Sequence, residues 1–409
     1  MKIIVIGSIA AGVSAALRLS AGQGNAQVTV YEAGAFLSCG AGGLPYYLSA
    51  GLPELHAAIQ GKERELAAQN VTARLRCRVE RIDAQARQIS GQDLSTGQAF
   101  ADRYDKLVVA TGALPQIPQV PGRRRVGVQT LKSVEDLIFL KEYLRTPYVQ
   151  DVVVLGGGWE GLELAKAVLK LGRRVRIITD SPQILPGLDP EVSQRVQRAL
   201  EEEGVQLSLG ESVRAFPGRT YIEQVQTGRG TYPCDLCLAA AGLTPNTGLL
   251  AAAGAELAPD GAALIGPELE TSVPGIYAAG ACAASREGSL RSGSVRVGGL
   301  EIARTGLTEA EAKQAGLRVK SATASGCDRP GICPNPREIT IKLVYEASTR
   351  QVVGAQAWGS KNVSTRINAI AVAIRAGMTA DALSQVDFVC SSCTTSIWDP
   401  IQVVCGQVR

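Results

Sequence analysis

The sequence predicts an α/β protein in which two strand–turn–helix units precede a smaller C-terminal α+β region. Three observations predict this class. Residues 2–6 and 151–155 are continuous apolar strands, and each runs into a glycine-rich turn followed by a helical pattern. Residues 337–345 instead alternate apolar and polar side chains, as a half-buried antiparallel strand does. A chain of 409 residues is too long for one core, so several domains are expected.

The composition is that of an ordinary globular protein, with 45% hydrophobic and 20% charged residues. A formal net charge of +4 is small for this length and predicts neither a nucleic-acid nor a membrane partner. The densest basic run, residues 123–125, lies in a proline- and glycine-rich loop, where a solvated face is the favoured interpretation. The sequence starts on a strand without room for a signal peptide, so we expect a cytoplasmic protein. Ten cysteines then indicate thiols, catalytic groups or metal ligands rather than a disulfide framework.

The first unit carries an incomplete dinucleotide-binding pattern. Gly7 and Gly12 take the outer places of G-x-G-x-x-G, Ile9 takes the middle place, and Ala11 lies inside the turn. Glu32 ends the second strand, where an acid binds a ribose hydroxyl while the helix N-terminus faces the pyrophosphate. Glycines that merely form a turn are the alternative. The strand, helix, second strand and acid in register favour a nucleotide site.

The second unit carries the complete pattern. Gly156, Gly158 and Gly161 occupy all three glycine places, and Asp180 ends the next strand. An acid at this place accepts hydrogen bonds from a ribose 2′-hydroxyl and repels a 2′-phosphate, which predicts NADH rather than NADPH. Two nucleotide units in series indicate a flavoprotein fed by a pyridine nucleotide, with FAD in the first unit and NADH in the second. Two nucleotide sites of one kind are the alternative.

Cys39 is the candidate redox residue around which the chain is organised. It follows the first strand–helix–strand unit, at the expected start of a helix. Unpaired backbone N–H groups and the helix dipole favour a thiolate there. A buried, inert cysteine is the alternative. His56 is the only histidine and is expected at the surface, so no histidine pairs with a nucleophile unless His56 folds back to Cys39.

At these motifs the chain resembles the single-cysteine class of the FAD-dependent pyridine nucleotide–disulfide oxidoreductases. This is the branch of coenzyme A-disulfide reductase, NADH oxidase and persulfide reductase. The resemblance covers nearly the whole chain. It rests on residues 36–40, 44–46, 110–112, 156–161, 242–246, 271–280, 303–309 and 398–401.

The resemblance implies a domain order and a set of site residues. It implies an FAD domain made of residues 1–114 and 243–320, an NADH domain at 115–242 and a C-terminal dimerisation domain at 321–409. It also implies a homodimer in which the C-terminal segment of one subunit lies over the redox cysteine of the other. The cofactor-binding residues it implies are Gly7, Ala11, Gly12, Glu32, Ala110, Thr111, Gly112, Gly156, Gly158, Gly161, Asp180, Gly242, Gly280 and Ala281.

The chain departs from this family in several places. Ala281 replaces the carboxylate of the family's Gly-Asp-Cys, which binds the ribityl or phosphate region of the flavin. Residues 283–303 lack the helix that points at the flavin ring. The peroxidase histidine of the family is Ala10, and Arg18 alone is left of the basic run that binds coenzyme A. No Cys-x4-Cys is present, which excludes the dithiol type.

Cys390 and Cys393 form a C-x-x-C in the segment that the resemblance places against the redox cysteine of the partner subunit. A thiolate attacks a disulfide through a mixed intermediate, so this pair could relay electrons from Cys39 of the other subunit. With Cys327 and Cys333 it could instead bind zinc or an iron–sulfur cluster. Inert thiols are the third interpretation.

The function predicted from these residues is an FAD-dependent NADH:disulfide or persulfide oxidoreductase with Cys39 as its single redox cysteine. The substrate is a small molecule. An NADH oxidase that reduces oxygen, with Cys39 cycling through sulfenic acid, is the alternative. An alternative function of another class is that of a non-catalytic or electron-transfer subunit of a redox complex, with weakened flavin binding.

Overall fold

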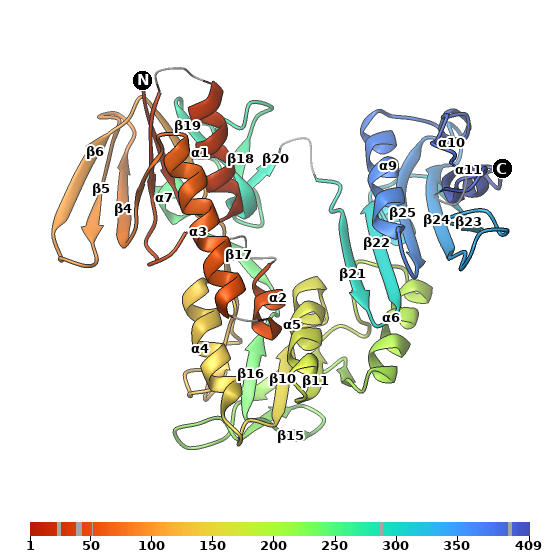
Figure 1. Cartoon of the computed structure of the whole chain (residues 1–409), viewed down its shortest axis with the longest axis horizontal. Coiled ribbons are helices and arrows are strands. Elements are labelled where there is room, and N and C mark those ends of the chain that lie inside the picture. The colour runs from red at the N-terminus through yellow and green to blue at the C-terminus, as the bar shows by residue number, and fades with distance from the viewer. Residues whose placement is uncertain (23–25, 38–42, 51, 286–288, 392–394) are drawn as a thin grey trace. The chain divides into compact units, whose positions relative to one another are not determined.

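The computed structural model describes residues 1–22, 26–37, 43–50, 52–285, 289–391 and 395–409 (Figure 1). It divides the chain into two compact units. Unit 1 contains Met1–Leu155, Ala167–Arg173 and Val213–Gly288, and unit 2 contains Gly156–Lys166, Arg174–Ser212 and Ser289–Arg409. The mixed α/β class predicted from the sequence is confirmed. No helix in the described part of the chain is long and apolar enough to cross a membrane.

The first sheet of unit 1 is parallel and has the strand order β19-β7-β1-β2-β3. Its strands are β1 (Lys2–Ile6), β2 (Gln27–Tyr31), β3 (Thr72–Arg74), β7 (Lys106–Val109) and β19 (Ile276–Ala278). Ile3, Ile4 and Val5 are fully buried, because helices cover one face of the sheet and an antiparallel layer covers the other. The two strands predicted around the first glycine turn are confirmed.

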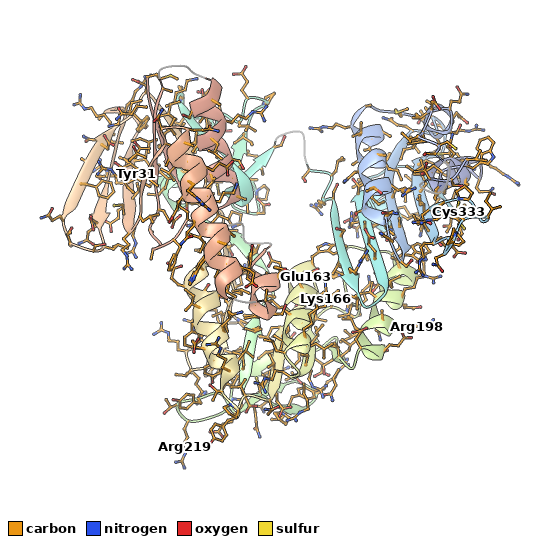
Figure 2. The ribbon with its side chains drawn as sticks, in the orientation of Figure 1. Tyr31, Glu163, Lys166, Arg198, Arg219 and Cys333 are labelled. Carbon is orange, nitrogen blue, oxygen red and sulfur yellow. The ribbon has the colours of Figure 1, made fainter. Side chains whose placement is uncertain are left out.

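The helices and the second layer of unit 1 surround this sheet. The helices are α1 (Ala10–Gly22), α2 (Leu44–Ser49), α3 (Leu52–Ala68), α4 (Val134–Arg145), α7 (Gly248–Ala252) and the 3-10 turn η2 (Gly280–Cys282). The antiparallel layer is β4 (Cys77–Asp83), β5 (Gln88–Asp93) and β6 (Ala99–Arg103). Tyr31, labelled in Figure 2, joins the two layers, since its ring stacks on Phe100 and its hydroxyl donates to Asp102 at 2.8 Å.

Unit 1 also contains the strand that leads into the second glycine turn, and two strands parallel to it. The parallel strands are β9 (Val128–Gln129), β10 (Asp151–Leu155) and β16 (Leu236–Ala239). The short remaining strands are β8 (Ala113–Pro115), β13 (Val213–Ala215), β14 (Gln224–Thr227), β15 (Thr231–Pro233), β17 (Leu243–Pro245), β18 (Ala263–Ile265) and β20 (Ala283–Ser285). As predicted, β10 is a buried apolar strand that ends where the turn begins.

Unit 2 combines a parallel strand pair with the C-terminal antiparallel sheet. The pair is β11 (Arg174–Thr179) and β12 (Gln206–Leu209). The sheet has the order β21-β22-β25-β24-β23, from β21 (Gly293–Val297), β22 (Leu300–Gly306), β23 (Val319–Cys327), β24 (Glu338–Glu346) and β25 (Val352–Gly359). The antiparallel strand predicted at residues 337–345 is confirmed as β24, which pairs with β25.

Helices complete unit 2. They are α5 (Trp159–Lys170), which begins in this unit, α6 (Pro190–Glu202), α8 (Glu309–Gln314), α9 (Val363–Arg375), α10 (Ala380–Ser384) and α11 (Pro400–Cys405). Ile341 and Leu343 of β24 are fully buried in a core that contains Ile367 of α9 and Val404 of α11. Figure 1 shows α9 and α11 beside this sheet. On the surface of α5, Lys166 and Glu163 form an ion pair at 2.8 Å (Figure 2).

A buried charged cluster fastens the start of α6 to the sheet of unit 2. Lys342 of β24 is nearly buried, and its Nζ lies 2.6 Å from Asp189 and 2.5 Å from Glu191. Gln356 donates to the Asp189 carboxylate at 2.7 Å and accepts from the Asp189 N–H at 2.7 Å, which fixes Asp189 beside Lys342. Burial alone would lower the pKa of Lys342, but the hydrogen bonds to Asp189 and Glu191 outweigh it and raise the pKa.

Candidate functional site

The first glycine turn of unit 1 is closely packed. Gly7 has a φ of +98°, and its N–H donates to the carbonyl of Tyr31 at 2.9 Å. A Cβ on Gly7 would overlap the carbonyl of Ala110, and a Cβ on Gly12 would overlap the carbonyl of Gly7. Only glycine fits at both places. The outer glycines therefore do what the pattern requires, although Ile9 takes the place of the middle one.

Glu32 is held in a fixed orientation at the end of β2. Its Oε2 accepts from the Ser8 N–H and its Oε1 from the Gly34 N–H, both at 2.8 Å. A carboxylate keeps further acceptor capacity after two such bonds, which suits a ribose hydroxyl. The Ser8 hydroxyl is buried and has no hydrogen-bond partner within the described residues. The turn thus offers an oriented acceptor and an unsatisfied polar atom.

A cavity of about 630 Å³ opens beside this turn. Gly7, Glu32, Thr111, Lys132 and Glu135 are among its lining residues. The volume lies in the range of small-molecule and cofactor sites. An oriented carboxylate for ribose and a helix N-terminus for a pyrophosphate fit the adenosine diphosphate portion of FAD. The residues present in unit 1 therefore fit the nucleotide end of this cofactor.

Several predicted residues from distant parts of the chain meet at this cavity. Ala110 packs against Gly7, and Thr111 lines the cavity. The Thr111 hydroxyl donates to the Asn246 carbonyl at 2.6 Å, and the Asn246 N–H donates to Gly112 at 2.8 Å. The predicted 110–112 segment is thereby fixed beside the first turn.

Other predicted cofactor residues lie outside the lining of this cavity. Gly242, with a φ of +139°, accepts from the Gln116 N–H at 3.0 Å, next to the β8–β17 pair. Gly280 and Ala281 are exposed in η2, and a Cβ on Gly280 would come within 2.9 Å of the Ala11 Cβ. Ala11 and Gly280 are therefore neighbours at the start of α1.

The stretch after η2 bears on the predicted loss of a helix. Within the described part of residues 283–303, the chain forms β20, β21 and the start of β22, and no helix. Cys282 is buried, and its thiol approaches the carbonyls of Val109 at 3.4 Å and Ala279 at 3.3 Å. The sulfur of the Gly-Ala-Cys turn therefore packs inward and is not presented to solvent.

The second glycine turn belongs to unit 2. Gly156 has a φ of +108°, and its N–H donates to the Ile178 carbonyl at 2.8 Å. A Cβ on Gly158 would meet nothing within 4 Å, so the backbone of the turn is open there. Asp180 follows β11 and is exposed, without a hydrogen-bond or ion-pair partner in the described chain. An open turn and an uncommitted carboxylate fit the adenosine portion of NADH.

Several residues beside the first turn carry no pattern that marks them in the sequence. Lys132 lies near Gly112, with 3.5 Å between its Nζ and a Cβ built on that glycine. Glu135 accepts from the Ala35 N–H at 2.7 Å. The capping box of Ser133 and Asp136 starts α4 beside them, and it is the one local signal that could have pointed to this segment.

The predicted catalytic cysteines are only partly described. Cys39 and Cys393 lie outside the described residues. Cys390 is exposed with a free thiol, and Cys327 is partly exposed and also free. Cys333 is buried and disulfide-bonded. Among the described side chains, no group of three or more His, Cys, Asp or Glu residues could hold a metal ion.

Two sequence families match this chain. The pyridine nucleotide-disulphide oxidoreductase family matches residues 1–310. Its dimerisation domain matches residues 293–395. The chain therefore belongs to the pyridine nucleotide-disulphide oxidoreductases, as the sequence motifs predicted.

Individual relatives narrow the comparison. An NAD(P)H sulfur oxidoreductase (CoA-dependent) of Pyrococcus abyssi is 29% identical over 98% of this chain and 97% of its own length. An NADH oxidase of Enterococcus faecalis is 28% identical over 95% of each chain. Among solved structures, an NAD-dependent persulfide reductase from A. fulgidus has a TM-score of 0.92 at 29% identity, covering 99% of this chain and 82% of its own. Reduced Bacillus anthracis CoADR-RHD has a TM-score of 0.93 at 25% identity, covering 99% and 79%.

Proposed function

We propose that this protein is an NADH-dependent flavoprotein oxidoreductase that reduces a sulfur–sulfur bond through Cys39. The observation that carries the proposal is the presence of two different nucleotide sites in one chain. One has a closed turn with the anchored carboxylate of Glu32. The other has an open turn followed by the uncommitted carboxylate of Asp180. The names of relatives that act on sulfur compounds support the same class.

The proposal divides the work among the predicted domains. Residues 1–114 and 243–320 bind FAD, residues 115–242 bind NADH, and residues 321–409 form a dimer. Glu32 orients the ribose of the first nucleotide and Asp180 that of the second. Bound FAD supplies the two-electron chemistry that connects NADH to a sulfur acceptor.

Cys39 performs the sulfur chemistry in this proposal. Its thiolate attacks one sulfur of a disulfide RSSR, forms a mixed disulfide and displaces RS⁻. Two electrons and one proton then break the mixed disulfide and return the Cys39 thiolate and RSH. Overall, NADH, one proton and RSSR give NAD⁺ and two RSH, so NADH is oxidised and the sulfur–sulfur bond is reduced.

We also propose that the active form is a homodimer. The match to a dimerisation domain supports this, as do exposed apolar side chains of unit 2. Val372, Val389, Ile397 and Trp398 are each at least 67% exposed in the single chain. Cys390 is exposed in the same region, which makes it available to a partner subunit.

We propose further that Cys390 and Cys393 relay electrons from Cys39 of the other subunit. The free, exposed thiol of Cys390 supports this proposal, because thiol–disulfide exchange needs an accessible thiol. A zinc or iron–sulfur site at these cysteines is the competing proposal. Metal and labile-sulfide analysis of the purified protein separates the two, since a relay requires neither.

Replacement of Cys39 tests the main proposal. Cys39→Ser should abolish anaerobic NADH oxidation by a disulfide or polysulfide and should leave NADH-to-dye activity in place. Cys234→Ala removes a buried thiol that the proposal does not use and should keep both activities. Disulfide turnover that survives in Cys39→Ser would refute the proposal.

NADH oxidase is the second candidate, because a relative with that name matches at 28% identity over nearly the full length. In this case oxygen accepts the electrons and Cys39 cycles through sulfenic acid. Oxygen consumption with NADH alone, at a rate equal to or above disulfide turnover, would favour it. Slow oxygen consumption with fast disulfide turnover would favour the sulfur reductase.

A further inference from the structure

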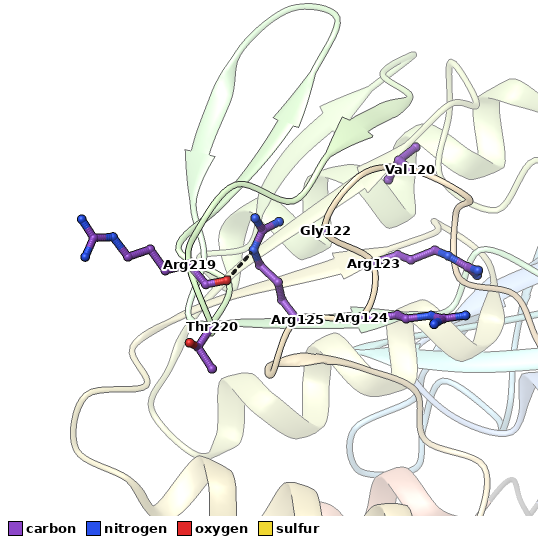
Figure 3. Close-up of a pocket in the computed structure, with 7 residues that line it drawn as sticks. All are labelled: Val120, Gly122, Arg123, Arg124, Arg125, Arg219 and Thr220. Carbon is purple, nitrogen blue, oxygen red and sulfur yellow. Dashed lines mark hydrogen bonds between the residues drawn. The ribbon is translucent and has the colours of Figure 1, made fainter.

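Two loops of unit 1 form an arginine-lined cavity that the proposed reaction does not use. The loops are residues 120–125 and 216–220, and the cavity between them has a volume of about 490 Å³ (Figure 3). Arg123, Arg124, Arg125 and Arg219 contribute to its wall, together with Thr220. No acidic side chain lines it. The sequence predicted a solvated loop face here, but the fold adds a second basic loop to the first.

Arg125 holds the two loops together. Its Nε donates to the Arg219 carbonyl at 3.0 Å, and its Nη1 donates to the Phe216 carbonyl. Gly122 has a φ of +84°, and a Cβ there would overlap the Arg125 guanidinium. Gly218, with a φ of +144°, turns the second loop. The Arg125 guanidinium therefore links the two loops, and its hydrogen bonds give them a defined shape.

The positive charges of the other three arginines have no acidic partner among the described residues. Arg123, Arg124 and Arg219 have no ion pair or side-chain hydrogen bond within the described residues. Figure 3 shows Arg123 and Arg124 extending in the same direction from their loop, while Arg219 extends to the opposite side. Two unit charges about 4 Å apart in water repel each other by about 1 kcal/mol, so adjacent guanidinium groups gain from a shared anion. Guanidinium groups bind phosphate in a planar, bidentate manner.

The cavity is separate from the nucleotide turns. Residues 120–125 precede β9, which pairs in parallel with β16. The arginine loop therefore lies at the amino ends of these strands. Dinucleotides bind at the carboxyl ends of strands in this type of sheet. An anion held by these arginines would be a ligand different from the two redox cofactors.

We propose that Arg123 and Arg124 bind the diphosphate group of a small phosphorylated molecule. Two adjacent guanidinium groups that extend in the same direction match two linked phosphates. The chain's net charge of only +4 favours a small ligand over a nucleic acid. Inorganic diphosphate and a nucleoside diphosphate share this chemistry.

Calorimetric titration of the flavin-loaded protein, with NAD⁺ saturating the dinucleotide site, tests the proposal. The probes are inorganic diphosphate, GDP and sulfate at one ionic strength. The test variant is Arg123→Ala/Arg124→Ala. The matched control is Arg103→Ala/Arg198→Ala, which removes the same charge from exposed positions on β6 and α6. Melting temperatures without ligand verify that both variants are folded.

The expected result is saturable binding of diphosphate that weakens about tenfold or more in the test variant and is unchanged in the control. Tighter binding of GDP than of inorganic diphosphate, with the same loss in the test variant, would identify the nucleoside form as the ligand. The proposal would be overturned by no saturable binding, by equal weakening in both variants, or by sulfate binding as tightly as diphosphate.

Discussion

The two glycine turns begin with the same backbone geometry and differ in the groups around them. In both, the first glycine has a positive φ, +98° at Gly7 and +108° at Gly156, and its N–H caps the neighbouring strand. A Cβ on Gly12, at the third glycine place of the first turn, would overlap the Gly7 carbonyl, whereas a Cβ on Gly158, at the middle place of the second turn, would meet nothing within 4 Å. The middle place therefore has room for a side chain, which is why the first turn forms with Ile9 there.

The acids that follow the two turns differ in how firmly their carboxylates are held. Glu32 is fixed by two backbone N–H groups at 2.8 Å, while Asp180 is exposed and uncommitted. A pre-oriented group loses little entropy when it binds a ligand, which suits a cofactor that stays bound. An uncommitted group suits a nucleotide that enters and leaves in each turnover. The comparison thus supports our proposal of a resident cofactor at the first turn and an exchanging one at the second.

The largest effect that tests this comparison is expected on the free energy of unfolding, when the glycines themselves are substituted. Gly12→Ala should lower the free energy of unfolding by about 3 kcal/mol, because the new methyl group overlaps the Gly7 carbonyl. Gly158→Ala should change it by less than about 0.5 kcal/mol. Urea denaturation of both variants measures the difference. Equal losses would show that the third glycine place of the first turn is no more crowded than the middle place of the second.

Glu32→Gln tests the anchored acid. An amide has only one acceptor oxygen and no charge, so the variant cannot accept from both Ser8 and Gly34 as the carboxylate does. Its affinity for FAD should fall by about tenfold or more, measured as flavin retained after dialysis. Glu80→Gln, on the exposed face of β4, should retain flavin normally. Full retention by Glu32→Gln would remove Glu32 from the cofactor site.

Asp180→Ala tests the uncommitted acid. The KM for NADH should rise by about tenfold, because a ribose hydroxyl loses a charged acceptor, and the preference for NADH over NADPH should shrink. Flavin content should stay unchanged. Glu202→Ala, an exposed acid at the end of α6, is the control and should leave both KM values alone. An unchanged nucleotide preference in Asp180→Ala would contradict the assignment.

The smallest effect concerns acid stability. Burial alone would raise the pKa of Glu191, but the hydrogen bond from Lys342 outweighs it and lowers the pKa. The hydrogen bond from Lys313 lowers the pKa of Glu309. A carboxyl with a lowered folded-state pKa stabilises the fold above its unfolded pKa, about 4.3, and this contribution is lost as the pH falls through the folded value. Melting temperatures should therefore drop below about pH 4, and Lys342→Met should make that drop shallower. A variant with the same acid profile as the parent would exclude this cluster.

Local patterns in the sequence were sufficient for the elements that bind nucleotides. Apolar continuity located β1, β2 and β10, and each acid was found because it directly follows a strand. Alternation located β24 in the C-terminal sheet. These features depend on neighbours within a few residues, which is why a single sequence could reveal them.

Features made by long-range contacts could not be predicted in this way. Asn246 meets Thr111 across 135 positions of the chain, and Arg125 meets Phe216 across 91. Neither pair has a pattern that marks it, because the strand order of the sheets brings the residues together. The hydrogen bonds by which Arg125 links the two loops, and with them the arginine cavity, are therefore visible only in the folded structure.

The most direct test of the central claim is an anaerobic single-turnover experiment on the flavin-loaded protein. NADH is added in the presence of a disulfide, and the visible flavin absorption and the released thiol are followed together. The account predicts rapid bleaching of the flavin, its recovery as the disulfide is consumed and two thiols released for each NADH. In Cys39→Ser it predicts bleaching without recovery or thiol release. Thiol release by Cys39→Ser at the parent rate, or no bleaching by NADH in the parent protein, would contradict the account.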